Sequence, residues 1–600
     1  MLIVLWAVAI WRPDRALIAL ALVVPFGSVA LTWLDAAPVK FTEAMTLATL
    51  AGSLIASVRS RTSERERLTA DAWAGMVFSV LVLASFAVVL AGREIGMQTP
   101  WTALRSLGIF LTHDYLVGPS PEFAGLADAA LLLEGLGLVW VIRRHAREQA
   151  SLVAGAVVAA AVAAVLLSLE QAGGAGTGLL RARASGPVAD VNAAGSFFAM
   201  AACAVVGMAL GRGAAQAARV AWTVLAATLL AGVWLSGSRM ALVAAIAGAM
   251  LLAAWTRLSH ARQRRWTIAV VAAGAAIVLI ALTVGLDPRP AATRTASHSF
   301  SARADFMITG LRMIASAPVF GVGIGRYFEM SGRFMPPSIY WFYFHENAHN
   351  NFLQIGGELG LLGLFAFVWF LIAAAQRIIQ AVRANPADTL MLASAAGAAT
   401  FVATWLTSHP LLVPEVAYSF WIVLGAALAR ADAALRRQAM GRPAARRGRI
   451  ATALIALLIV CSVPLRARDA GRGQSLEQVT FGFYDWENDN GFPYRWTGRR
   501  ATFFVPAGAR ELHIPVRSMM ILGHQEPVRF SIAVNGRVLD TFPITQGNWE
   551  TVQLRLPPGS TASAFTRIDV ITDPSWTPAA TGANHDVRVL GVQVGKPEAQ

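Results

Sequence analysis

The chain has 600 residues, of which 56% are hydrophobic and 14% are charged, and its mean hydropathy is +0.54. Soluble globular proteins carry about 45–50% apolar and about 25% charged residues, so this composition excludes that class and indicates a polytopic membrane protein. The formal net charge is +15, but the basic residues gather in separate short loops rather than in one stripe. That distribution argues against a nucleic-acid partner.

Long apolar runs recur from the start of the chain to residue 466, and most are close to the length that crosses a bilayer as one helix. They lie at 16–34, 38–57, 71–91, 125–142, 149–168, 191–211, 218–236, 240–256, 266–285, 352–374, 388–407, 414–430 and 450–466. Together with the short segment 1–11 they predict about 12 to 14 transmembrane helices. Segment 1–11 lacks the basic leader and cleavage site of a signal peptide, so we expect it to be retained.

The distribution of arginine predicts the orientation of these helices, because short basic loops stay in the cytoplasm. The basic loops are 59–67, 143–147, 212–219, 257–265, 377–383 and 430–449. Alternating the helices from these loops places the outer loops at 92–124, 169–190 and 286–350, with everything after about 467 outside as well. We therefore expect a multi-pass membrane protein whose outer loops lie on the side of the membrane away from the cytoplasm. Cys203 and Cys461 both fall in apolar runs, so neither a disulfide nor a cysteine metal site is expected.

The composition changes near residue 470, where short alternating segments replace the apolar runs. The expected strands are 501–505, 511–516, 529–534, 537–542, 550–556, 567–572 and 586–594, and Asn535-Gly536 predicts a tight hairpin. We expect a membrane domain over 1–467 and a periplasmic β-sandwich or jelly roll over 468–600. The first residues of this second domain are rich in aromatics and arginine. Trp486 and Trp496 could stack on sugar rings, or they could pack the core of the sandwich.

Several arginines lie at the predicted outer ends of the spans, where positive residues are scarce. Arg183 precedes Asn192 at the start of one span, and Arg239 follows a Ser-Gly-Ser turn at the start of another. Arg303 precedes an amphipathic stretch of the outer loop 286–350 that ends in the sequence Pro-Val-Phe-Gly-Val-Gly-Ile-Gly. A charge at such a position is costly without an anionic partner, so these arginines indicate an anionic ligand on the outer face.

His349-Asn350 lies at the start of a long apolar run, and Gly360 and Gly363 follow after nine further residues. This His-Asn-x9-Gly-x-x-Gly pattern resembles the signature of the O-antigen ligase and polymerase-related membrane glycosyltransferases. The arginine loop, the Ser-Arg turn and the glycine-rich turn precede it in the order typical of that family. The resemblance covers about 170–430, most of the membrane core.

The resemblance implies a type C glycosyltransferase-like helical fold and transfer of a glycan from a polyprenyl-pyrophosphate carrier. The acceptor would be a hydroxyl of a glycan or of a lipid A-core-like molecule at the periplasmic face. Ligation of O-antigen, polymerisation of repeat units and glycosylation of exported proteins all share this architecture, and the sequence leaves the three open. The C-terminal β domain is not a usual part of a plain ligase.

Such a reaction assigns roles to the polar residues. Guanidinium groups bind phosphate oxygens in bidentate fashion, so Arg239 and Arg303, with Arg183, are expected to hold the pyrophosphate. His349 is expected to take the acceptor proton during an inverting attack on the anomeric carbon. The further substrate-binding or imidazole-orienting candidates are Asn192, Asn350, Glu346 and Glu358. No cofactor or metal is expected, because the early outer loops lack the acidic pair of metal-using lipid-linked glycosyltransferases.

Two alternatives remain. His345-Glu346-x-x-His349 also fits the zincin pattern, in which two histidines one helical turn apart bind zinc and the glutamate acts as a base. No third ligand follows in register, because Phe352 and Ile355 occupy the positions that a metzincin fills with glycine and histidine. A transporter would place charged residues near the middle of several spans, whereas here they are expected at the ends.

Overall fold

The computed structural model describes residues 1–27, 40–60, 69–93, 124–174, 183–188, 190–210, 215–257, 292–336, 339, 346–386, 388–436, 456–464, 466, 480–489, 491–506, 508–519, 527–534, 537–545, 547–557, 565–578 and 588–600. The chain divides into two compact units. The first comprises Met1–Phe86 and Leu126–Cys461, and the second comprises Ala87–Gly125 and Ser462–Gln600.

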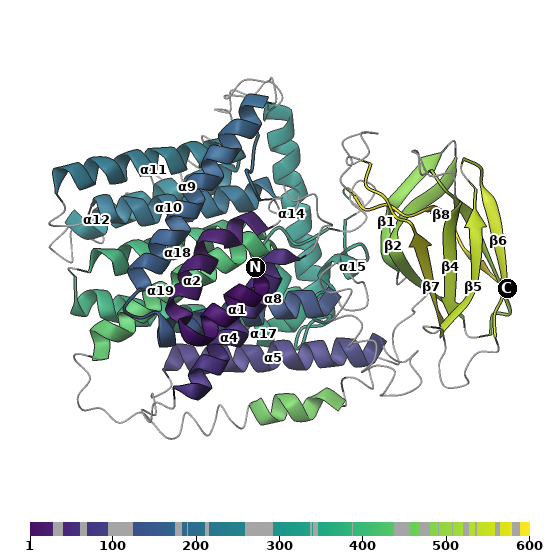
Figure 1. The fold of residues 1–600 in the computed structure, drawn as a ribbon, viewed down its shortest axis with the longest axis horizontal. Helices are drawn as coiled ribbons and strands as arrows, with labels where there is room; N and C mark the ends of the chain where they lie inside the picture. The colour runs from purple at the N-terminus through teal and green to yellow at the C-terminus, as the bar shows by residue number, and fades with distance from the viewer. Residues whose placement is uncertain are drawn as a thin grey trace. The chain divides into compact units, whose positions relative to one another are not determined.

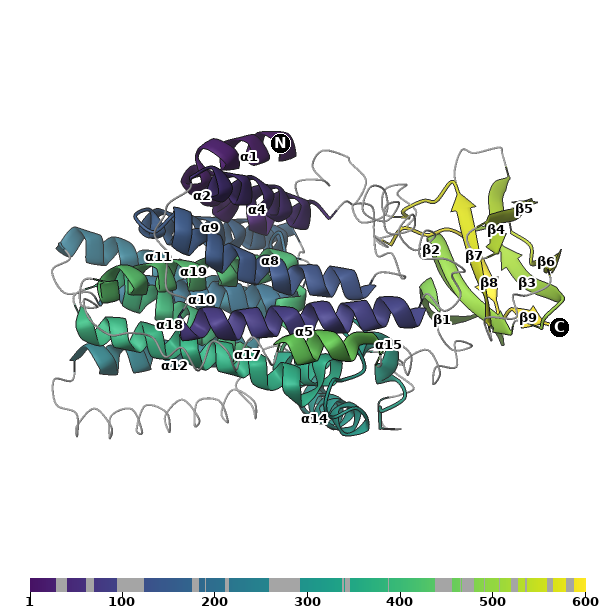
Figure 2. The same cartoon turned by 90° about the horizontal axis from the view of Figure 1, so that it is seen from below.

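The first unit is a bundle of helices (Figures 1 and 2). Eight helices within the described residues are long and apolar enough to cross a membrane, which confirms a polytopic membrane fold. They are α4 (Phe41–Arg59), α5 (Ala70–Arg93), α8 (Ala124–His145), α9 (Ala150–Gly174), α10 (Val191–Ala209), α11 (Gln216–Ser236), α17 (Asn351–Ala384) and α19 (Pro414–Arg436). Shorter apolar helices are α1 (Leu2–Trp11), α12 (Arg239–Arg257) and α18 (Thr389–Thr404).

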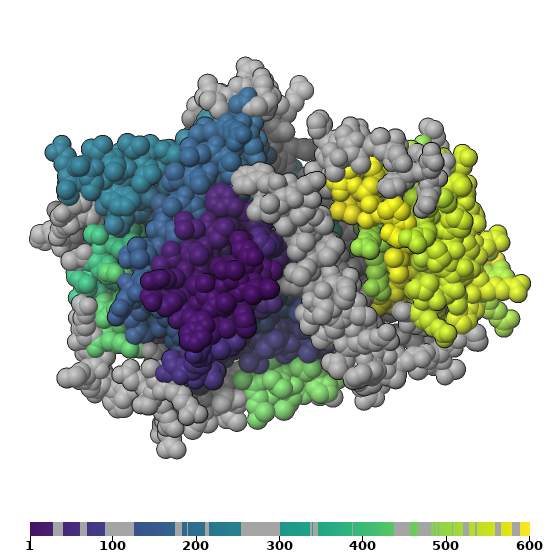
Figure 3. All heavy atoms as spheres, viewed as in Figure 1, coloured from purple at the N-terminus to yellow at the C-terminus, as the bar shows by residue number. Residues whose placement is uncertain are grey.

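The predicted spans coincide with helices wherever the structure describes them. The predicted span 266–285 lies outside the described residues, and 450–466 is helical over 456–464. Helix α1 has 10 residues and rises only about 15 Å, half the hydrocarbon thickness, so it is too short to cross alone. It packs on α4 and on α2 (Pro13–Val23), which continues into the 3₁₀ turn η1 (Val24–Phe26). These N-terminal helices form one compact area in Figure 3.

An ion-pair network ties four helices together at the arginine-rich ends of α8 and α19. Arg143 of α8 bonds Asp432 of α19 through Nε at 2.8 Å and also contacts Asp71 of α5. Arg377 of α17 reaches the other oxygen of Asp432 at 2.5 Å. Both buried carboxylates of this network, Asp71 and Asp432, therefore have a cationic partner, which favours keeping charge inside a helical bundle.

Charged residues do not all keep to the helix ends, so that expectation is wrong at Glu134. Glu134 lies halfway along α8 and is 6% exposed. Its carboxylate accepts a hydrogen bond from the hydroxyl of Tyr418 in α19. A carboxyl group can occupy the interior of a membrane bundle where a partner on a neighbouring helix satisfies it.

The described residues of the predicted outer loop 286–350 include the helix α14 (Ala292–Ser316) and the short helix α15 (Tyr327–Ser331). Helix α14 is the expected amphipathic stretch, and it packs on α17. The glycine-rich turn 317–325 joins α14 to α15 and has positive φ at Gly321, Gly323 and Gly325.

This turn docks into a break in α17. Gly360, inside α17, has a φ of 70°, so the helix is interrupted there and its backbone groups need other partners. The hydrogen bonds that supply them are Leu361 N to Pro318 O at 2.7 Å, Val322 N to Gly357 O at 2.9 Å and Gly323 N to Glu358 O at 2.9 Å. These hydrogen bonds between the glycine-rich turn and α17, which we call the interlock, fix α14 against the first part of α17.

The second unit contains a nine-stranded sheet, antiparallel at every described strand pair, in the order β5-β4-β7-β2-β8-β3-β6, with β1 added beside β2 and β9 beside β3. The strands are β1 (Phe481–Asp489), β2 (Phe492–Pro506), β3 (Glu511–Arg517), β4 (Val528–Val534), β5 (Arg537–Ile544), β6 (Glu550–Arg555), β7 (Phe565–Asp573), β8 (Gln593–Gly595) and β9 (Glu598–Ala599). The sheet curls around a single core of apolar side chains (Figure 2). A C-terminal β domain is thus confirmed.

The strand predictions differ from the structure at the start of this unit. Strand β1 was not expected, and β2 begins nine residues before the predicted 501–505. The aromatic segment before residue 500 alternates too weakly in polarity to predict a strand. Residues 535–536 lie outside the described part, but Val534 pairs with Arg537, the register that a two-residue hairpin requires.

Replacing Gly360 with alanine tests the interlock. A Cβ there would lie 2.3 Å from Val319 O, and the positive φ disfavours any side chain, so we expect Gly360→Ala to cost more than about 2 kcal/mol. Gly155 of α9 is the matched control, because a Cβ there meets nothing within 4 Å. Gly155→Ala should be neutral or stabilise by up to about 1 kcal/mol. Thermal melting of the purified proteins measures both, and equal melting temperatures would contradict the interlock.

Candidate functional site

The polar residues singled out in the sequence cluster around the starts of three helices. Asn192 lies in the first turn of α10, Arg239 is the first residue of α12, and His349 precedes α17 by two residues. Arg303 comes from α14. The N-terminus of a helix carries a partial positive charge, so an assembly of such ends already favours an anion.

Arg183 is held against the turn between α11 and α12. Its Nε donates to Ser236 O at 3.1 Å, and its Nη2 donates to Asn192 Oδ1 at 3.3 Å. The next residue repeats the attachment, with Ala184 N donating to Leu235 O at 3.0 Å. Arg183 and Asn192 are therefore hydrogen-bonded to each other beside the helix start that carries Arg239.

The turn before Arg239 is built by glycine. Gly237 ends α11 with a φ of 69°, so that α12 can start two residues later. Gly195 of α10 lies so close to this turn that a Cβ on it would be 2.5 Å from Ser236 Oγ. The absence of a side chain at Gly195 lets α10, which carries Asn192, approach the Arg239 turn.

Three guanidinium groups concentrate positive charge here. Burial, followed by the charges of Arg183 and Arg239, lowers the pKa of the Arg303 guanidinium below its ordinary value. Part of this lowering of the pKa comes from the two neighbouring cations, which therefore act on Arg303 across the site. Like charges in a partly desolvated place repel one another, and an anion bound among them would relieve that repulsion.

His349 lies in a backbone conformation that is unusual for its residue type. Its φ is 46°, the only positive value at a non-glycine residue in the described chain. The residues on both sides hold it: Ala348 N donates to Gln354 Oε1 at 3.0 Å, and Asn350 caps α17 by accepting from Leu353 N at 3.1 Å. Strain of this kind persists where the surroundings over-determine it, which is common at functional sites.

The imidazole of His349 is surrounded by rings and cations. It stacks on Phe306 of α14 with centroids 5.0 Å apart and touches His409 at 4.6 Å. Burial and then the charges of His409 and Arg303 lower the pKa of His349 from 6.5 to about 3. His349 is consequently neutral at physiological pH and has a lone pair that can accept a proton.

His409 was not found by sequence reasoning. It lies in the short connection between α18 and α19, ahead of the 3₁₀ turn η5 (Pro410–Leu412). Its Nδ1 is buried and has no hydrogen-bond partner among the described residues. Burial lowers the pKa of His409, while the charge of Asp190 acts in the opposite direction. A lone histidine before a proline gives no motif, so only the fold brings it to His349.

The three residues suggested to orient the imidazole make different contacts in the structure. Glu346 lies close to it, with Oε1 3.8 Å from His349 Nε2. Asn350 uses its amide to cap α17 and to donate to Leu406 O at 3.0 Å. Glu358 accepts a hydrogen bond from Gln354 at 2.8 Å, and its described contacts do not include His349.

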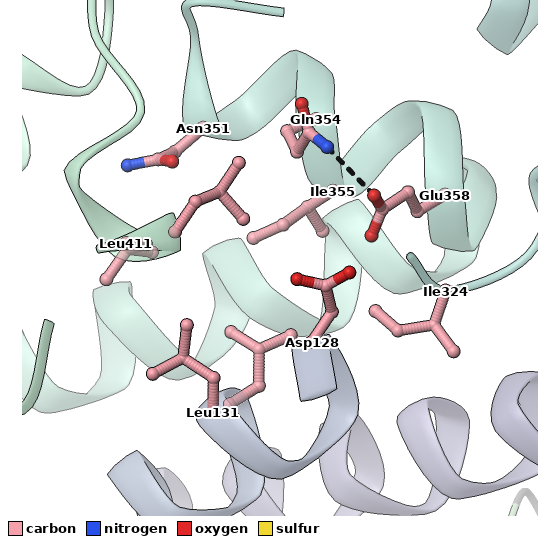
Figure 4. A pocket seen from close by; sticks show the side chains of 10 residues that line it. Asp128, Leu131, Ile324, Asn351, Gln354, Ile355, Glu358 and Leu411 are labelled. Atoms are coloured by element: carbon pink, nitrogen blue, oxygen red, sulfur yellow. Dashed lines mark hydrogen bonds between the residues drawn. The ribbon is translucent and has the colours of Figure 1, made fainter. Parts of the chain in front are cut away.

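Glu358 instead lines a small cavity with Asp128 (Figure 4). The two carboxylates point toward each other, and Asn351 lies at the opposite side. The cavity offers about 20 Å³ to the centre of a water-sized sphere, enough for about one water molecule and too little for a sugar. Glu358 therefore lies in a small, mostly apolar pocket inside the bundle.

The described residues of the metalloprotease pattern do not form the helix that zinc binding requires. Zincins need both histidines on one helical face, but residues 346–350 are not helical and α17 starts at Asn351. His345, the first histidine of the pattern, lies outside the described residues. Within the described chain, no group of three acidic, cysteine or histidine residues is arranged to hold a metal ion.

A protein-family model matches the middle of the chain. Residues 224–368 fit the family model described as O-antigen ligase. The matched segment runs from α11 into α17 and includes Arg239, Arg303 and His349, while Arg183 and His409 lie outside it. No curated protein matches the chain.

The lowered pKa of His349 predicts how stability depends on pH. The unfolded chain protonates this histidine below about pH 6.5 and the folded chain does not, so stability falls as the pH drops from there toward 3. The loss is at most about 1.4 kcal/mol per pH unit. His349→Gln should match wild type near pH 8 and melt at a higher temperature than wild type near pH 5. Parallel melting curves across this range would show that His349 has an ordinary pKa.

Proposed function

The chain belongs to an O-antigen ligase-related family, and we propose that it is a membrane glycosyltransferase that moves a glycan from a polyprenyl-pyrophosphate carrier to an acceptor hydroxyl at the periplasmic face. The observation that carries this proposal is the gathering of Arg183, Arg239 and Arg303 beside a neutral histidine, His349. The reaction needs a cationic place for its leaving group and a base for its acceptor, and this cluster offers both.

The three arginines bind the pyrophosphate. Their charges already oppose one another in the free protein, so a pyrophosphate removes repulsion as well as adding attraction. The negative charge on the leaving oxygen grows as the glycosidic bond to phosphate breaks, and fixed guanidinium groups stabilise it most at that stage. The helix starts at Asn192 and Arg239 add their partial positive charge.

His349 takes the acceptor proton. The acceptor oxygen attacks the anomeric carbon from the side opposite the pyrophosphate, the bond from that carbon to the phosphate oxygen breaks, and the imidazole receives the hydroxyl proton. The configuration at the anomeric carbon inverts, and polyprenyl pyrophosphate leaves. Glu346, 3.8 Å from the ring, stabilises the imidazolium that forms.

Donor binding strengthens this base. In the free protein, burial and then the charges of His409 and Arg303 hold the pKa of His349 far below 6.5, where an imidazole accepts protons poorly. A pyrophosphate beside Arg303 offsets that positive charge and raises the pKa of His349 toward the working pH. The base therefore becomes effective when the donor is in place.

The distribution of basic residues between the two ends of the bundle supports the proposed periplasmic location. The Arg143–Asp432 network lies at the ends of α8 and α19 that carry basic residues, which the positive-inside rule assigns to the cytoplasm. Asn192, Arg239 and His349 lie at the starts of α10, α12 and α17. The alternation of spans puts these starts on the opposite side of a bacterial inner membrane. Ligation and polymerisation both fit this geometry.

Transfer of a radiolabelled glycan from a polyprenyl-pyrophosphate donor by the purified protein in EDTA tests the proposal. We expect wild type to be active, His349→Ala to lose about 10²–10⁴-fold, and Arg239→Ala and Arg303→Ala to lose at least as much as one oxyanion donor contributes, about 10²-fold. Arg312→Ala is the matched control, because Arg312 is an exposed arginine on the same helix as Arg303.

Two results would contradict the proposal. Wild-type activity lost in EDTA and restored by zinc would favour the metalloprotease alternative. An Arg303→Ala variant as active as Arg312→Ala would show that Arg303 does not contribute to binding the pyrophosphate.

Replacing Arg303 with lysine separates charge from geometry. Lysine keeps the positive charge but cannot form a bidentate contact with a phosphate, so Arg303→Lys should recover only part of the activity lost in Arg303→Ala. We expect the remaining loss to be about tenfold and to appear in kcat/KM for the donor. Full recovery in Arg303→Lys would mean that activity depends on the positive charge at this position and not on a bidentate contact with the phosphate.

A further inference from the structure

The β domain carries an aromatic face that its core does not use. Phe492 and Tyr494 lie on β2 opposite Asp489 and Glu487 of β1, and alternate residues of a strand share one side of the sheet. Trp549, which immediately precedes β6, contacts both rings, with centroids 4.6 Å from Phe492 and 6.0 Å from Tyr494. We call Phe492, Tyr494 and Trp549 the aromatic face.

A balanced set of charges borders these rings. Arg517 of β3 lies over Trp549 at 4.6 Å and pairs with Asp489 at 2.9 Å. The hydroxyl of Tyr494 donates to Glu487 Oε2 at 2.9 Å, and Glu487 also receives Arg588 at 3.3 Å. Guanidinium donors and carboxylate acceptors thus alternate around the rings.

The aromatic face differs from the aromatics that stabilise the fold. The sequence left open whether the tryptophans near the start of this domain pack or bind, and Trp496 packs: it is 7% exposed and lies against Trp576. Phe492 is 39% exposed, and its ring lies against Gly595, where a Cβ would come within 2.9 Å of it. None of the three residues of the aromatic face belongs to the apolar core of the sheet. Because residue 595 is glycine, the exposed ring of Phe492 can lie directly against the sheet.

We propose that the aromatic face, with Arg517 and Asp489, is a binding site for a glycan, namely a neutral stretch of the polysaccharide that the membrane unit handles. Sugar rings present C–H groups on their faces and hydroxyls on their edges. The exposed ring of Phe492 and the half-buried rings of Tyr494 and Trp549 match the faces, while paired donors and acceptors match the hydroxyls. The site would hold acceptor or product chains near the enzyme and raise their local concentration.

The charge pattern favours this ligand over two others. An anionic polymer or an anionic membrane would be drawn by an excess of positive charge, but Arg517 is paired with Asp489 and Arg588 with Glu487. Binding should therefore change little with ionic strength. A protein partner would be expected to bury a wider apolar area than three rings provide.

The identity of the glycan as the transferred polysaccharide rests on the proposed function, whereas glycan binding itself does not. The probe is the soluble polysaccharide released by mild acid from the surface glycolipids of the organism that encodes the chain. Its affinity for the full-length protein is measured by calorimetry in the His349→Ala background, so that turnover does not consume it. Transfer from a short synthetic donor is measured separately with His349 intact.

We expect saturable binding that is unchanged by salt and weakened about tenfold in Trp549→Ala, with partial recovery in Trp549→Phe. Leu539→Ala is the matched control, because Leu539 is a 43% exposed apolar residue on β5. Phe492→Ala provides a second test if Trp549→Ala melts early. Transfer from the short donor should be retained in every β-domain variant.

Three results would overturn the proposal: wild type that binds no polysaccharide, Trp549→Ala and Phe492→Ala that bind as wild type does, or binding of anionic vesicles that depends on Trp549. Glycan binding together with absent transfer would instead reject the proposed enzyme and leave this binding site intact. Transfer with no glycan binding would reject the site and leave the enzyme.

Discussion

The break in α17 at Gly360 is the constraint on which the arrangement of the membrane unit's site depends. An interrupted helix leaves backbone groups without partners, and in a membrane those groups cannot turn to water. The turn after α14 supplies them, through hydrogen bonds such as Leu361 N to Pro318 O at 2.7 Å. The same contacts fix α14, with Arg303 and Phe306, against the first part of α17, so a glycine inside one helix sets the distance between a cation on another helix and His349.

This arrangement makes the site incomplete without an anion. Arg183, Arg239 and Arg303 repel one another, and the charge of Arg303 also acts on His349. The fold holds these arginines and His349 together, because the groups do not attract one another. Such an arrangement is common at ligand-binding sites. In the proposed reaction, a diphosphate carrier would relieve this repulsion and make the imidazole more basic, so that donor binding would also activate the acceptor.

Most helices and the existence of the β domain could be predicted from the sequence, because long apolar runs and the sharp change in composition near residue 470 are local signals. Arg183, Arg239, Arg303 and His349 could be selected because polar residues at outer helix ends are rare and here follow a family order. Glu134, His409 and the roles of Asn350 and Glu358 could not, because each depends on which helices become neighbours. Strand β1 was missed since its aromatic residues point to both sides of the sheet and blur the alternation.

Cryo-electron microscopy of the protein with polyprenyl pyrophosphate, the product that keeps the leaving group, tests the central claim most directly. The diphosphate should lie among the guanidinium groups of Arg183, Arg239 and Arg303, on the side that faces His349, with the prenyl chain running into the bilayer. A diphosphate bound at the opposite end of the bundle, near Arg143 and Arg377, or density that avoids Arg303, would contradict the assignment of this cluster as the donor site.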